Sequence, residues 1–251
     1  MGHENGYRGD NRLRRDLGPI VAGMATMPSR GETLPLALAS IIGQVDRLYL
    51  YLDGHDEVPS SIREQPKVTP ILSRHVPDLR GAGKLLGLTL EPAQGLFVSV
   101  DDDILYPDDY VASLCEGLRA QDYRAVVGYH GSILTRPFIR YSESRTVFYF
   151  AEALRSACRV DVLGAGTVMF APEVLRFDVR QWPDGLHVVD LRFAIEAAKR
   201  SVPLICLDRP DDYVRPLALG QPDSAYASLK NDDSRQSALA LELLHLTGKS
   251  A

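Results

Sequence analysis

The sequence predicts an α/β fold, a single domain whose mainly parallel central sheet is flanked by helices and followed by a C-terminal helix. Apolar runs typical of buried strands alternate with segments of helical periodicity through residue 119. The length of 251 residues suits one large domain. A content of 45% hydrophobic and 24% charged residues is that of a globular protein with a sizeable core. We expect the domain to cover residues 19–251, after a flexible polar N-terminal segment, 1–18.

The first half of the chain alternates strands with helices. Continuous apolar runs, or runs rich in aromatic and β-branched residues, predict strands over 20–25, 47–52, 68–72 and 95–100. Apolar residues at helical spacing, or a helix-start signal, predict helices over 34–42, 84–90 and 107–118. Parallel strands joined by right-handed crossovers are the expected arrangement of such an alternation.

The second half is less regular. Strands are expected over 124–134, over 160–170 with an interruption at Gly164-Ala165-Gly166, and over 202–207. Helices are expected over 190–200 and, after a capping segment at 231–234, over 235–246. Residues 135–159 show no strong period and are interpreted as an excursion or a loop.

Composition excludes several classes of function. The formal net charge is −5, without the basic footprint of a nucleic-acid-binding protein. No apolar run approaches the ~20 residues of a membrane-spanning helix, and the N-terminus lacks the apolar core of a secretory signal. Cys115, Cys158 and Cys206 lie far apart in apolar surroundings, which favours a reducing compartment. We therefore expect a cytoplasmic protein with no nucleic-acid partner and no membrane span.

An Asp-x-Asp run follows the clearest strand of the sequence. Ligands of open α/β sheets bind beyond the carboxyl ends of the strands, and Asp101, Asp102 and Asp103 stand at such an end. Side chains two residues apart on an extended backbone point the same way. The ionised carboxylates of Asp101 and Asp103 would therefore repel each other, and each would favour protonation of the other. Mg²⁺ or Mn²⁺ removes that repulsion and prefers such oxygen ligands. The alternative is a turn with acidic residues that cap the next helix.

Four segments follow one another along the chain: Met27-Pro28-Ser29-Arg30 after the first strand, Asp78 to Lys84, the aspartates 101–103, and the stretch from Leu163 to Leu191. In this order they resemble the GT-A nucleotide-diphospho-sugar transferases, close to glycosyltransferase family 2. The resemblance spans residues 19–208 and implies a GT-A (Rossmann-like) fold.

The resemblance implies roles for the residues around the donor. Asp103 would bind the metal directly, and Asp101 would contact the metal or the ribose of the nucleotide. The donor-binding set it implies is Arg30, Asp53, Lys84, Asp101 and Asp102. The alternative for Lys84 is a solvated side chain near a helix start, and Arg30 has a similar alternative.

On the acceptor side, the resemblance makes Asp190 the candidate catalytic base. An inverting transfer needs a carboxylate that takes the proton of the acceptor hydroxyl, although Asp is also a favoured helix N-cap. Gly164 and Gly166 would let the backbone approach the sugar, or mark a plain bulge. His130 and Trp182 are further candidates for sugar or acceptor contact, with ordinary structural roles as the alternative. His187 and His245 are both open as a third metal ligand.

These expectations combine into a metal-dependent glycosyltransferase that uses Mn²⁺ or Mg²⁺. The donor would be a nucleotide-diphosphate sugar, with a UDP-sugar expected first, and the acceptor a glycan, a lipid-linked molecule or a small metabolite. Two alternatives stay open at this point. One is a nucleotidyltransferase on a related fold, and the other is a sugar- or nucleotide-binding module without turnover.

Overall fold

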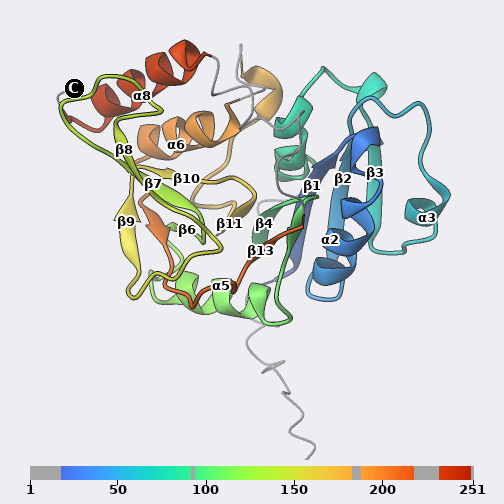
Figure 1. The fold of residues 1–251 in the computed structure, drawn as a ribbon. Coiled ribbons are helices and arrows are strands. Elements are labelled where there is room, and N and C mark those ends of the chain that lie inside the picture. The colour runs from blue at the N-terminus through green and yellow to red at the C-terminus, as the bar shows by residue number, and fades with distance from the viewer. Residues whose placement is uncertain (1–17, 92–93, 183–187, 218–231, 250–251) are drawn as a thin grey trace, which may run out of the picture.

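A computed structural model describes residues 18–91, 94–182, 188–217 and 232–249. Its centre is an eight-stranded mixed sheet in the order β3-β2-β1-β4-β11-β6-β12-β9 (Figure 1). This confirms the expected α/β class with a largely parallel central sheet. The strands are β1 (Ile20–Thr26), β2 (Arg47–Leu52), β3 (Val68–Leu72), β4 (Leu96–Asp101), β6 (Val126–Gly128), β9 (Cys158–Val160), β11 (Thr167–Phe170) and β12 (Leu204–Cys206).

The order of the strands changes direction beside β1. From β1 the chain proceeds outward through β2 to β3, and it then returns to place β4 on the other side of β1, with all four strands parallel. The strand β11 runs antiparallel to both β4 and β6, and β12 is parallel to β6. The carboxyl ends of β1 and β4 therefore flank a topological switch point, the place where open α/β sheets bind their ligands.

Two small sheets complete the strand content of the described residues. One has the order β10-β7-β8, and the other pairs β5 with β13. Their strands are β5 (Ile104–Leu105), β7 (Gly131–Leu134), β8 (Arg145–Phe148), β10 (Val162–Leu163) and β13 (Arg215–Pro216). The segment 135–159 thus contains β8, which forms an antiparallel hairpin with β7.

Helices cover both faces of the central sheet. The α-helices of the described residues are α2 (Thr33–Ile42), α3 (Ser60–Arg63), α4 (Gly87–Leu90), α5 (Tyr110–Arg119), α6 (Val189–Lys199) and α8 (Ser234–Leu246). Short 3₁₀ turns occur at η1 (Pro28–Arg30), η2 (Ser73–His75), η3 (Arg80–Leu85) and η4 (Val179–Gln181). The expected C-terminal helix is confirmed and ends before Gly248, which has a φ of +67°.

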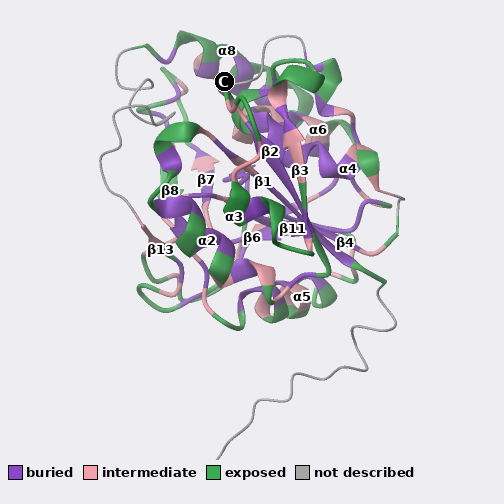
Figure 2. Cartoon of the chain, turned by 90° about the vertical axis from the view of Figure 1, so that its right-hand side faces the viewer, coloured by how far each residue is buried: buried purple, intermediate pink, exposed green. Residues whose placement is uncertain are grey.

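The alternation of side chains along the strands gives the protein two hydrophobic layers. In β1, Ile20, Ala22 and Met24 face the layer that contains the buried sides of α2 and α5. Val21 faces the opposite layer, which contains the buried sides of α6 and α8. Figure 2 shows the resulting pattern, with largely buried strands at the centre and helices that are exposed on their outer sides.

Three expected elements differ from the structure. The interrupted strand expected over 160–170 comprises the end of β9, β10 and β11, and β10 belongs to a different sheet from the other two. The single strand expected over 124–134 divides into β6 and β7, which belong to different sheets. The helix expected over 84–90 is a 3₁₀ turn, η3, followed by the short α4. A Cβ on Gly83 would lie 2.2 Å from the ring of Tyr51, so glycine lets this turn pack closely on β2.

Within the described ranges, no helix combines the length and the apolar character needed to cross a membrane. The N-terminal segment 1–17 lies outside the described residues.

Candidate active site

The three aspartates lie at the switch point between β1 and β4. Asp101 is the last residue of β4, and it stands in register with Ala25 near the end of β1. Asp102 and Asp103 form the turn that leads into β5. The acidic run therefore occupies the place where the topology of the sheet predicts a ligand.

Lys84 forms an ion pair with Asp101. Lys84 Nζ lies 2.5 Å from Asp101 Oδ1, and Lys84 is only 8% exposed, which excludes the alternative of a solvated lysine. Burial alone disfavours its charge, but Asp101, Asp190 and Asp103 outweigh that effect and raise the pKa of Lys84. The site thus contains a cation that is held between carboxylates.

Glycine in β1 explains how the Lys84 turn reaches the sheet. A Cβ on Gly23 would lie 1.8 Å from the carbonyl oxygen of Lys84. Any side chain at this position would push η3 away from the strand. The small residue in the middle of an apolar strand therefore has a positioning role for Lys84.

Asp102 is the buried member of the acidic run. It is 7% exposed, and its Oδ1 lies 3.9 Å from Nε of Arg30, a residue that is itself 7% exposed. Burial raises the pKa of Asp102 to about 7, while the Thr26 hydroxyl and the Arg30 guanidinium act in the opposite direction. Arg30 is thus tied to the acidic run rather than solvated.

Asp103 is the carboxylate that remains available to a ligand. Burial, and next the charge of Asp101, raises the pKa of Asp103 to about 6, although Arg30 and Lys84 oppose the shift. No ion pair of Asp103 occurs in the described part of the chain. A proton or a cation bound at Asp103 relieves the repulsion from Asp101 that contributes to this raised pKa.

Gly166 and Tyr106 hold the backbone and carboxylate of Asp101 in place. A Cβ on Gly166 would lie 1.8 Å from Asp101 Oδ2, so only glycine leaves room for the carboxylate. The hydroxyl of the buried Tyr106 accepts a hydrogen bond from the amide of Asp101 at 2.7 Å and donates one to the carbonyl of Gly166 at 2.8 Å. Tyr106 therefore ties the acidic turn to the glycine-containing loop.

Asp190 lies across this loop from the acidic run. It is in the first turn of α6, whose N-cap is Val188, and no side chain caps the helix. Asp190 Oδ1 instead accepts a hydrogen bond from the amide of Ala165 at 2.8 Å. The interpretation of Asp190 as a helix N-cap is therefore wrong, and its carboxylate bridges α6 and the Gly164–Gly166 loop.

The environment of Asp190 favours a carboxylate that accepts protons. Burial raises the pKa of Asp190, while Lys84 and the Ala165 hydrogen bond limit the shift and Asp101 adds to it. A raised pKa makes a carboxylate a better proton acceptor.

The remaining expected residues occupy different surroundings. Asp53 follows β2, and its amide donates to the carbonyl of Thr26 at 2.8 Å, so the ends of β1 and β2 adjoin. Gly164 packs on His130, since a Cβ would lie 2.7 Å from the imidazole. Trp182 stacks on Phe177 at 5.3 Å and is 9% exposed, as expected of a core residue.

Histidine does not complete a metal site in the described residues. Burial, and next the charges of Arg145 and Arg209, lowers the pKa of His130 to about 4, so its ring is neutral near pH 7. His245 is exposed on α8, and His187 lies outside the described residues. No group of three or more His, Cys, Asp or Glu side chains able to hold a metal occurs in the described ranges.

Three residues of this region were not singled out from the sequence. Tyr106 bonds the acidic turn, the charge of Arg145 lowers the pKa of Asp190, and burial together with the charge of Asp190 raises the pKa of Tyr141. The sequence signal that could have pointed to Tyr106 is its position, three residues after Asp103. Tyr141 and Arg145 lie in the segment 135–159, which has no periodicity that points to a site.

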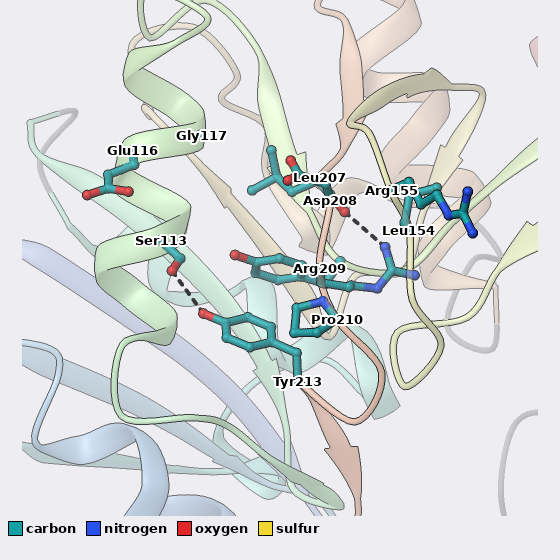
Figure 3. A pocket seen from close by; sticks show the side chains of 11 residues that line it. Ser113, Glu116, Gly117, Leu154, Arg155, Leu207, Asp208, Arg209, Pro210 and Tyr213 are labelled. Carbon is teal, nitrogen blue, oxygen red and sulfur yellow. Dashed lines mark hydrogen bonds between the residues drawn. The ribbon is translucent and has the colours of Figure 1, made fainter.

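A cavity of about 540 Å³ lies apart from the acidic run, between α5 and the segment 207–213 (Figure 3). Some of its polar groups bond within the protein. Tyr213 shares a hydrogen bond of 2.9 Å with Ser113, and Arg209 donates to the carbonyl of Leu207 at 2.9 Å. None of the candidate site residues predicted from the sequence lines this cavity.

Neither a scan against models of protein families nor a search of curated proteins finds a match for this chain. The function of the protein has to be inferred from the chemistry of the acidic site.

Proposed function

We propose that this protein is a metal-dependent glycosyltransferase of the GT-A type, which transfers a sugar from a nucleotide-diphosphate donor to an acceptor hydroxyl. The observation that carries the proposal is the arrangement at the switch point. Asp101 ends β4 and Asp102 and Asp103 follow it, Lys84 and Arg30 pair with two of these aspartates, and Asp190 lies across the Gly164–Gly166 loop from them. Charges of both signs at this edge suit a ligand that consists of a cation and a diphosphate.

The donor set of the acidic run fits a hard divalent cation. Carboxylate oxygens are the ligands that Mg²⁺ and Mn²⁺ prefer, and one or two of them commonly act together with substrate phosphates. Asp103 would hold the cation, with Asp101 beside it, and the diphosphate would supply further oxygens. When bound, the metal would stabilise the negative charge of the leaving diphosphate.

The basic residues near the aspartates would hold the rest of the donor. Lys84, which pairs with Asp101, would direct positive charge to the diphosphate. Asp53, which follows β2 beside the end of β1, would accept hydrogen bonds from the ribose or the base. We expect a UDP-sugar as the donor.

Asp190 would act as the base of an inverting transfer. Its carboxylate would take the proton of the acceptor hydroxyl while the hydroxyl oxygen forms a bond to the anomeric carbon. The bond from that carbon to the diphosphate oxygen breaks in the same step, and the electron pair leaves with the nucleoside diphosphate. Attack from the side opposite the leaving group inverts the configuration at the anomeric carbon.

The proposal is tested by the binding and turnover of nucleotide sugars. Calorimetry with UDP, and with other nucleoside diphosphates, is expected to show binding that depends on Mn²⁺. Asp103→Asn is expected to lower that affinity at least tenfold, whereas Asp108→Asn, which changes an exposed acid nearby, is expected to leave it unchanged. Metal-independent affinity, or equal affinity in the two variants, would remove the proposed role of the acidic run.

The products separate the proposed activity from its alternatives. A glycosyltransferase releases the nucleoside diphosphate from a nucleotide sugar, together with a glycosylated acceptor or the free sugar. A nucleotidyltransferase would instead release pyrophosphate from a nucleoside triphosphate and a sugar phosphate. Mn²⁺-dependent binding without either product, over a broad panel of donors and acceptors, would indicate a binding module.

A further inference from the structure

The hairpin β7–β8 brings an arginine to the acceptor side of the proposed site. Arg145 begins β8, and its guanidinium carbon lies 4.2 Å from the ring centroid of Tyr141, which is 4% exposed. The neighbouring strand of the same small sheet, β10, leads directly into the Gly164–Gly166 loop. Ala165 in that loop donates to Asp190. The hairpin and the candidate base are thus joined through one short sheet.

Arg145 is a partly buried cation that forms no ion pair with a carboxylate in the described ranges, although its charge acts at longer range on Asp190. Its contact with Tyr141 supplies a modest cation–π attraction, which does not replace an anion for a partly desolvated charge. Arg209, whose charge also lowers the pKa of His130, differs from Arg145 because its guanidinium has backbone carbonyls as hydrogen-bond partners. Arg209 is 5% exposed, and its guanidinium donates to the carbonyls of Phe150, Leu207 and Tyr149.

The charge of Arg145 acts on Asp190, the candidate base. It lowers the pKa of Asp190 as one of several opposing effects, and it also lowers the pKa of His130. His130 is neutral near pH 7, and its Nδ1 is a buried atom without a hydrogen-bond partner. Among the described residues, the acceptor side therefore presents a cation that forms no ion pair and that acts electrostatically on the carboxylate that would accept a proton.

The donor does not account for this cation. The proposed diphosphate position at the ends of β1 and β4 already has Lys84 and Arg30, whereas Arg145 comes from a separate sheet on the side of Asp190. An anion that meets Arg145 would thus arrive with the molecule whose hydroxyl Asp190 deprotonates. A planar guanidinium binds a carboxylate or a phosphate through two parallel hydrogen bonds.

We propose that Arg145 binds an anionic group, a carboxylate or a phosphate, on the acceptor, so that the enzyme glycosylates acidic rather than neutral acceptors. This inference rests on the proposed glycosyltransferase function. A hydrogen bond to a charged group of this kind corresponds to a preference of about ten- to a hundredfold.

Matched pairs of acceptors test the inference. With a donor that the protein turns over and with Mn²⁺, donor consumption is measured with glucuronate against glucose, galacturonate against galactose, and glycerol 3-phosphate against glycerol. At least one acidic member is expected to stimulate transfer about tenfold or more over its neutral partner. The uronates and the phosphate distinguish a carboxylate from a phosphate as the recognised group.

Variants assign the preference to Arg145. Arg145→Gln is expected to abolish the preference for the acidic member, Arg145→Lys to retain part of it, and Arg159→Gln, which changes an exposed arginine on β9, to retain all of it. Equal use of neutral and acidic acceptors, no response to any acidic member, or an unchanged preference in Arg145→Gln would overturn the inference.

Binding of UDP and Mn²⁺ is measured in parallel on each variant. Intact binding together with a missing acid preference refutes only the role of Arg145. A wild-type protein that binds no nucleoside diphosphate with Mn²⁺ refutes the proposed function itself.

Discussion

At the scale of single residues, Asp102 has the clearest energetic consequence. Its carboxyl is buried in the turn after β4, and its pKa is raised to about 7 from an ordinary value of 3.8. The folded protein therefore retains this proton over a pH range in which the unfolded chain has released it. The free energy of unfolding falls as the pH rises through that range, because the unfolded state binds fewer protons.

We predict that Asp102→Asn stabilises the metal-free protein increasingly as the pH rises from about 4 to about 7.5. The difference in unfolding free energy between variant and wild type is expected to grow by about 3 kcal/mol, since one pKa unit corresponds to about 1.4 kcal/mol. Denaturant unfolding at several pH values, without divalent cations, measures this difference.

The difference between the two proteins is needed because His130 acts in the opposite direction. Burial lowers its pKa to about 4 from 6.5, so its contribution to stability rises with pH. His130 is present in both proteins, and its contribution cancels. A difference that stays flat between pH 4 and 7.5 would show that Asp102 ionises normally in the folded state.

At the scale of elements, the acidic turn and the glycine-containing loop are held together by one tyrosine. Tyr106 follows β5, and its hydroxyl bonds the backbone of both Asp101 and Gly166. The ring of Tyr110, the first residue of α5, packs on Tyr106 at 4.6 Å, but its hydroxyl has no hydrogen-bond partner in the described chain. The two tyrosines therefore differ in the polar contacts that they make, although both are fully buried.

We predict that Tyr106→Phe costs about 2–4 kcal/mol of unfolding free energy, because it leaves a buried amide and a buried carbonyl without partners. Tyr110→Phe removes an unpartnered hydroxyl and is expected to be neutral or slightly stabilising. Thermal and denaturant unfolding compare the two variants.

A loss of Mn²⁺-dependent UDP binding in Tyr106→Phe, with binding retained in Tyr110→Phe, is also expected. Equal losses of stability in the two variants would mean that the hydrogen bonds of Tyr106 do not hold the acidic turn.

Local sequence patterns predicted the elements on which the acidic run depends. The strands β1 to β4 coincide with runs of apolar, aromatic or β-branched residues, and the C-terminal helix has both a start and a stop signal, so each was recognised within a few residues. The division of 124–134 into β6 and β7 was not predictable, because both pieces are apolar and only tertiary pairing assigns them to different sheets. The hairpin with Arg145 was missed because β8 is only four residues long.

The candidate site was predictable in part, because only some of its residues are marked by a local sequence pattern. Asp101 to Asp103 follow an apolar strand directly, which marks them as residues at a sheet edge. The burial of Lys84 depends on Gly23 in another element, and the bridge from Asp190 to Ala165 joins residues 25 positions apart. Contacts of this kind follow from the packed fold and leave no local signal.

At the scale of the whole molecule, the topology gathers the carboxylates on one edge. The reversal of strand order beside β1 exposes the ends of β1 and β4 together, and the antiparallel β11 brings the Gly164–Gly166 loop, which precedes it, to the same edge. Asp190 follows at the start of α6. A chain with a net charge of −5 thus places four aspartates around one loop, next to two buried basic residues.

A crystal of the protein soaked with MnCl₂ and UDP tests this account most directly. Anomalous scattering at the manganese edge is expected to show one ion at the Asp103 carboxylate, with diphosphate oxygens on its other side and the uridine toward Asp53. Manganese that binds elsewhere, or UDP bound at the switch point without a metal at Asp103, would contradict it.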